Sequence, residues 1–149
     1  MMSEHRATIA WRRGAAAPGA QPYSSDHTWS FNDALEVKAS AAAAYGGTAE
    51  FVDPEQAYVA ALSSCHMLTF LALANKRGFI VETYTDEAVG YLEKNADGRM
   101  AMTRVELRPT IVFAADAMPD EGQLANLHEK AHKYCFIANS VTTDVTVAV

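Results

Sequence analysis

The sequence has little cysteine and no concentration of positive charge, and both shortages limit what the protein can be. Only two cysteines, Cys65 and Cys135, occur among 149 residues. A chain of this length can bury a core without disulfide staples or a structural metal. Its 12 basic residues are outnumbered by 18 acidic ones, giving a net charge of −6. With no basic block present, we expect no binding to nucleic acid or to anionic lipid.

The first residues, MMSEHRATIAWRRG, also lack the apolar core of a secretory signal peptide. We therefore expect a cytoplasmic protein whose cysteines are reduced thiols. In that compartment a disulfide is more often transient and catalytic than structural. The sequence contains no repeat and no low-complexity linker, so we expect one domain over residues 1–149.

The clearest element is a long uncharged stretch that predicts a helix. Asp53 can cap it, Pro54 suits the first helical position and Gly78 suits the stop. Residues 57–74 carry no charge and are apolar all round, which predicts a helix buried on every side. A membrane span competes by length, but no second span supports it. Five side chains also lower the hydrophobicity of the stretch: Ser63, Ser64, Cys65, His66 and Thr69.

Strand and helix patterns surround this long helix. We expect a strand at 7–13, a hairpin turning at Asn32–Asp33, a hairpin over 83–113 turning at NADG, an amphipathic helix at 118–135 and an alternating strand at 139–149. This order predicts an α+β fold. A chain of this size has too little bulk to cover an apolar helix on all sides. We therefore expect an intertwined homodimer in which two such helices pack together.

The segments around the two cysteines resemble the OsmC/Ohr family of thiol peroxidases. DPEQAYVAALSSCHM is followed by AHKYCFIANSV, whose cysteine lies seventy residues after the first. The family pattern has a Pro-Glu-Gln/Glu helix start, a cysteine ten residues after the glutamate and a second cysteine ending a later helix. Here these positions are Glu55, Cys65 and Cys135. The resemblance covers roughly residues 7–149 and implies an α+β homodimer with β-sheets wrapped around long buried central helices and active sites at the interface.

What the resemblance implies is reduction of organic hydroperoxides in an oxidative stress response, without a cofactor. A thiol attacks the O–O bond as a thiolate, and an apolar site disfavours that anion, so a nearby cation has to stabilise it. The family supplies an arginine paired with the glutamate. Cys65 would become a sulfenic acid, and Cys135 would condense with it to a disulfide. An external thiol or a lipoyl protein would then reduce this disulfide.

The arginine has two candidates, Arg12 and Arg13, in WRRG. We favour Arg13 and keep Arg12 as the alternative. If neither residue has a catalytic role, the two arginines are a solvated pair at the end of a strand. Glu55 and Cys65 are ten positions apart, which is roughly 15 Å along a straight helix and about 80° in azimuth. They cannot meet within one regular helix. We therefore expect the Arg–Glu pair and the thiols of one site to come partly from different subunits.

Other interpretations compete with the peroxidase. The thiols could be inert in a non-catalytic OsmC-like stress or binding protein, because free cysteine is commonly buried. HEKAH at 128–132 matches a zinc-protease pattern that places His128 and His132 on one side of a helix. No Glu or His follows residue 132 to act as third ligand, so we expect no metal and place both histidines at the helix edge. His66 adjoins Cys65 but points about 100° away from it, which does not favour a Cys–His nucleophile pair. The flanking sequences do not separate the Ohr branch from the OsmC branch.

Overall fold

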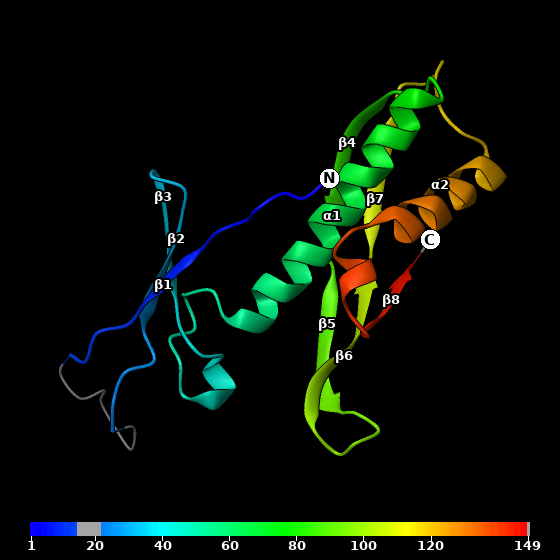
Figure 1. Ribbon diagram of the computed structural model, residues 1–149. Helices are drawn as coiled ribbons and strands as arrows, with labels where there is room; N and C mark the ends of the chain where they lie inside the picture. The colour runs from blue at the N-terminus through cyan, green and yellow to red at the C-terminus, as the bar shows by residue number, and fades with distance from the viewer. Residues whose placement is uncertain (15–21, 149) are drawn as a thin grey trace. The chain divides into compact units, whose positions relative to one another are not determined.

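The computed structural model describes residues 1–14 and 22–148 and divides the chain into two compact units. Unit 1 comprises Met1–Ala57 and unit 2 comprises Tyr58–Val149 (Figure 1). Each unit is described by itself below. The single domain expected over residues 1–149 stays a prediction.

Unit 1 contains a three-stranded antiparallel sheet in the order β1-β2-β3. Its strands are β1 (Thr8–Ala10), β2 (His27–Phe31) and β3 (Leu35–Ala39), so the first strand is shorter than the expected 7–13. The hairpin between β2 and β3 is confirmed. Asn32 adopts a left-handed φ of 56°, which asparagine tolerates better than most residues, so the turn closes without glycine.

A partly buried polar network ties the segment after β3 to the start of β2. Asp26 accepts hydrogen bonds from the Thr48 hydroxyl at 2.6 Å and from the Ser40 hydroxyl at 2.9 Å. These bonds, the one from Thr48 above all, hold the pKa of Asp26 below its ordinary value. The segment between them includes the short 3-10 helix η1 (Ala43–Tyr45). The network therefore explains how a stretch without long regular elements is ordered.

Helix α1 (Pro54–Lys76) begins and ends close to where its sequence predicts. The Asp53 carboxylate accepts the Gln56 N–H at 2.8 Å, and the Gln56 side-chain oxygen accepts the Asp53 N–H at 3.0 Å. This reciprocal pair is a capping box. At the other end Gly78 takes up a left-handed φ of 81°, which stops the helix.

The second hairpin is more segmented than its sequence predicts. β4 (Val81–Asp86) pairs with β7 (Pro109–Phe113), and β5 (Val89–Lys94) pairs with β6 (Met100–Leu107), all antiparallel. The two long strands expected over 83–113 are therefore each interrupted. The physical reason lies at the break, where the Asp86 side chain accepts the Arg108 N–H at 2.6 Å in place of a ladder partner.

The end of the chain closes a second sheet in unit 2. Helix α2 (Glu121–Tyr134) leads through the 3-10 helix η2 (Ala138–Ser140) to β8 (Asp144–Val147). β8 lies parallel to β6, giving the order β5-β6-β8. Over residues 141–148 the odd-numbered residues are half-buried and the even-numbered ones exposed, as the alternation predicts. Val149, which the prediction included, lies outside the described residues.

One stripe of α1 supplies the core of unit 2. Phe70 packs in one cluster with Leu127 and Ala131 of α2, against residues of β4 and β7. In Figure 1 these elements lie beside α1. A second cluster joins the N-terminal half of α1 to β6 and β8. The α1 residues that are fully buried recur every four positions: Leu62, His66, Phe70 and Ala74.

Within a single chain, α1 is buried on that one side. On another side Leu68 is 60% exposed, so the all-round burial expected from the sequence requires a further covering surface. By length and composition α1 could also cross a membrane, but core helices of globular proteins pass the same test. The polar side chain of His66 within its buried stripe, hydrogen-bonded to α2, fits a core helix.

Candidate active site

The two cysteines are neighbours in unit 2. Cys65 lies in the middle of α1 and is half-buried, whereas Cys135 follows the last residue of α2 and is 1% exposed. Both are free thiols. The pKa of Cys135 is raised, first by burial and then by the adjacent Cys65 side chain. Folding therefore brings together two sulfurs that are seventy residues apart in the chain.

Backbone groups after α2 enclose the Cys135 sulfur. The residue leaves the helix with an extended backbone, at φ −68° and ψ 115°. Its Sγ accepts the Ala138 N–H at 3.4 Å, and its carbonyl accepts the Asn139 N–H at 3.0 Å. η2 is thus folded back over the thiol. The backbone N–H groups of Ala138 and Ile137 favour a thiolate and so lower the pKa of Cys135, but burial and Cys65 outweigh them, so Cys135 is held as a protonated thiol.

The predicted arginine and glutamate lie in unit 1. The Arg13 guanidinium lies over the rings of Trp11, at 5.5 Å, and Tyr23, at 6.0 Å, in cation–π contacts beside a hollow of about 400 Å³. Arg12 lines a different hollow, of about 500 Å³. Glu55 is half-buried in the first turn of α1. None of the ion pairs found among the described residues involves these three side chains.

The sequence analysis missed a buried pair of histidines in unit 2. The His66 Nε2 and His128 Nδ1 atoms are 3.0 Å apart, and the two residues are 1% and 5% exposed. The expectation that His128 and His132 share the helix edge is wrong, because only His132 is exposed. A signal was present: His66 lies four residues from Leu62 and from Phe70, and thus within the apolar stripe of α1.

Both buried histidines are neutral at ordinary pH. Burial lowers the pKa of His66 to about 4, helped by the neighbouring His128 and His132 and opposed by Asp86. Burial likewise lowers the pKa of His128. No cluster of three or more metal-binding side chains occurs in the described part of the chain.

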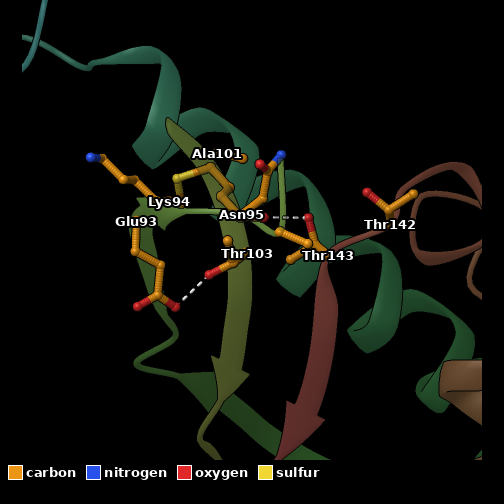
Figure 2. A pocket seen from close by; sticks show the side chains of 9 residues that line it. Glu93, Lys94, Asn95, Ala101, Thr103, Thr142 and Thr143 are labelled. Carbon is orange, nitrogen blue, oxygen red and sulfur yellow. Dashed lines mark hydrogen bonds between the residues drawn. The ribbon is translucent and has the colours of Figure 1, made fainter. Parts of the chain in front are cut away.

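A polar hollow of about 380 Å³ lies elsewhere in unit 2, beside the turn between β5 and β6 (Figure 2). Its lining includes neither cysteine. Its polar groups bond to the protein itself: the Thr143 hydroxyl donates to the Met102 carbonyl at 2.7 Å, and the Asn95 side chain accepts two N–H groups of the turn at 3.0 Å each. These hydrogen bonds stabilise the hairpin, and the hollow is separate from the thiol pair.

Comparison with known proteins identifies the fold and the family. A family model described as OsmC-like protein matches residues 47–149. The chain belongs to the OsmC-like family. The resemblance and the α+β fold inferred from the sequence are thereby confirmed.

Solved structures extend the match over nearly the whole chain, and a curated relative matches two thirds of it. An OsmC-like protein of unknown function from Vibrio cholerae is 44% identical, with a TM-score of 0.92 and 99% of each chain covered. An organic hydroperoxide resistance protein from Legionella pneumophila is 18% identical, with a TM-score of 0.72 over 100% of this chain and 99% of the other. That second likeness shows the fold alone. The uncharacterized protein YmaD of Bacillus subtilis is 26% identical over 100 residues, and the alignment spans 66% of each chain.

Acid should destabilise the protein through the histidine pair. An unfolded histidine binds a proton near pH 6.5, whereas native His66 has a pKa of about 4. Between these values the unfolded state binds more protons, so the free energy of unfolding falls as the pH falls. We expect a loss on the order of 2 kcal/mol between pH 7 and pH 4.5, measured by urea denaturation. His66→Phe should reduce this dependence, and His5→Gln, at an exposed position, should preserve it. An undiminished pH dependence in His66→Phe would contradict the assignment.

Proposed function

We propose that this OsmC-like protein is a thiol peroxidase that reduces organic hydroperoxides. The observation that carries the proposal is the meeting of the two free thiols, Cys65 and Cys135, in one largely buried site. Family membership supports it, as do fold relatives named organic hydroperoxide resistance proteins, from Legionella pneumophila, Elizabethkingia anophelis and Bacillus subtilis. A reducing compartment such as the cytoplasm would keep the resting thiols free.

The proposed cycle consumes one peroxide and two reducing equivalents. The Cys65 thiolate attacks one peroxide oxygen; an S–O bond forms, the O–O bond breaks and the departing alkoxide takes a proton to become an alcohol. The Cys135 thiol then attacks the sulfenic sulfur, forming the disulfide and releasing water. A dithiol, or two thiol molecules, reduces the disulfide and returns both cysteines to the thiol state. A lipoyl protein is a reductant of the required chemistry.

The different burial of the two cysteines supports this division of roles. Cys65 is half-buried, so part of its side chain is open to a peroxide. Cys135 is enclosed, and its raised pKa keeps it protonated and unreactive until Cys65 has been oxidised. A thiol that attacks a peroxide needs access and a low pKa, whereas a resolving thiol is held beside its partner and loses its proton as it displaces the sulfenic hydroxyl as water.

We assign the activation of Cys65 to Arg13, with Glu55 orienting its guanidinium. The influences on Cys135 are burial, Cys65 and two backbone N–H groups, and a basic side chain is not among them. A thiolate in a dry site needs a cation. Arg13 is held against the faces of two aromatic rings in unit 1, a setting that also suits an apolar peroxide tail. In this proposal the Arg–Glu pair and the thiols of one site come partly from different subunits.

The same proposal includes a homodimer built on α1. Between residues 60 and 72, the side of α1 that one chain leaves exposed carries no charge and is made mostly of small residues, which allow a second helix to approach closely. A second copy of this face would bury it and satisfy a twofold arrangement. The exposed positions are Ala60, Ala61, Ser64, Leu68 and Ala72.

Cys65→Ser should abolish peroxide turnover, whereas Cys135→Ser should stop after one oxidation per chain with a lipoyl reductant. Removal of the nucleophile prevents the first step, and removal of the resolving thiol leaves Cys65 as a sulfenic acid. Consumption of cumene hydroperoxide measures turnover, and intact-protein mass spectrometry distinguishes the disulfide from the sulfenic acid. Full turnover by Cys65→Ser would eliminate the peroxidase. Absence of turnover in the wild-type protein would leave a non-catalytic binding or stress protein.

Arg13→Gln should slow the oxidation of Cys65 by about 10–100-fold, the loss expected when one charge-assisted hydrogen bond is removed. Stopped-flow measurement of the first oxidation reports this step without the reductant. Arg12→Gln is the matched control, because it removes the adjacent guanidinium, and its rate should stay near that of the wild type. The reverse order would transfer the role to Arg12.

Leu68→Glu should convert the dimer to a monomer. A carboxylate on the apolar side of α1 would be buried without a partner between two copies. Sedimentation velocity at micromolar concentration measures the oligomeric state. Met118→Glu places the same charge at a residue that is 58% exposed outside α1 and should leave the dimer intact. A wild-type protein that sediments as a monomer would refute this part of the proposal.

A further inference from the structure

The buried histidine pair joins the two helices that carry the cysteines. His66 directly follows Cys65 on α1, and His128 precedes Cys135 by seven residues. Seven residues are close to two full helical turns, so His128 and Cys135 lie on nearly the same side of α2. In the described part of the chain, His66–His128 is the buried side-chain hydrogen bond that links α1 to α2, whereas Arg77, just beyond α1, donates to Asn126 of α2 at an exposed position.

The geometry of the pair restricts both rings. The nitrogen atoms are 3.0 Å apart, and the ring planes lie within 9° of parallel. Phe70 packs on His128 with a centroid distance of 4.6 Å. Both histidines are almost fully enclosed. Neither ring can therefore turn without breaking the hydrogen bond or displacing core side chains.

The buried Nδ1 atom of His66 also determines which of the two histidines donates the hydrogen bond. His66 Nδ1 is buried without a hydrogen-bond partner among the described residues. If His128 donated the shared proton, His66 would carry an N–H on Nδ1 with no acceptor, which costs about 1–3 kcal/mol. His66 therefore donates from Nε2 to His128 Nδ1. This contact is directional, whereas the alkyl contacts around it are not.

A directional hydrogen bond can fix the rotation of a helix about its axis, which apolar packing alone leaves variable. Contacts of Phe70, Leu127 and Ala131 bury the facing sides of α1 and α2, but hydrophobic burial is non-directional and tolerates small rotations of one helix about its axis. A rotation of α1 moves the Cys65 sulfur away from Cys135 at once, because Cys65 is adjacent to the buried stripe. The histidine bond opposes that rotation at the neighbouring residue.

We propose that His66 and His128 are positioning residues that hold Cys65 in reach of Cys135 by fixing the rotation of α1 against α2. The biological meaning of this inference rests on the proposed redox function of the two cysteines. The pair itself touches no reacting atom.

The test measures the effective concentration of the Cys135 thiol toward the Cys65 thiol. The full-length protein is equilibrated with glutathione, where two protein thiols and one oxidised glutathione give the protein disulfide and two reduced glutathione molecules. The equilibrium constant gives the effective concentration of one thiol toward the other. His66→Phe keeps a ring of similar size without the donor, and we expect it to lower the effective concentration at least about tenfold. His66→Gln keeps a donor near the Nε2 position and should stay within about threefold of the wild type.

Leu62→Ala is the matched control. It removes packing from the same buried stripe, one turn from His66, without touching the hydrogen bond. It should lower the stability but keep the effective concentration within about threefold of the wild type. An effective concentration in His66→Phe equal to that of the wild type, or an equal loss in Leu62→Ala, would overturn the proposal.

A second comparison applies if His66→Phe does not fold. His66→Asn has an amide too short to reach His128, so it should fall below His66→Gln in effective concentration; equal values would overturn the proposal. The equilibrium is measured without peroxide. A protein that fails the peroxidase assay can still give the predicted order, so failure of the function and failure of the positioning role are distinguishable.

Discussion

Packing of one face of α1 against α2 and the strands of unit 2 is the constraint on which the candidate site depends. Leu62, His66, Phe70 and Ala74 recur every four residues, so a single stripe supplies the core contacts and the buried histidine. Cys65 lies beside this stripe and is half-buried, whereas Cys135 is enclosed at the end of α2. The same packing thus leaves one sulfur accessible and covers the other. The two thiols therefore differ in exposure because Cys65 lies beside the buried stripe of α1, whereas Cys135 lies at the enclosed end of α2.

Features with local causes could be predicted from the sequence. Asp53 and Gln56 cap each other within one turn, and Gly78 stops α1 by its own backbone conformation. Both ends of the helix could therefore be predicted from nearby residues. The turn at Asn32 has the same local character. The cysteines were identifiable because the family spacing from Glu55 to Cys65 and on to Cys135 is a pattern in the chain itself.

Features made by residues far apart in the chain could not be predicted in the same way. The interruption of the long hairpin depends on Asp86 reaching the backbone of Arg108. The histidine pair joins residues 62 positions apart, and the HEKAH pattern pointed to the wrong partner for His128. The choice between Arg12 and Arg13 stayed open for a related reason: adjacent residues of one type carry no local mark of which one meets a distant thiol.

The place of Cys135 just beyond α2 has a consequence for the oxidised protein. Because the residue follows the last helical position, its sulfur can approach Cys65 through small backbone rotations at 135–137, and α2 can keep its full length. Phe136, which is 80% exposed, and Ile137 follow directly on the chain. Closing the disulfide would therefore alter how much aromatic and aliphatic area the chain exposes to solvent, while its helix content stays constant. The oxidation state of an internal pair of sulfurs would then change the apolar surface that the protein exposes to solvent.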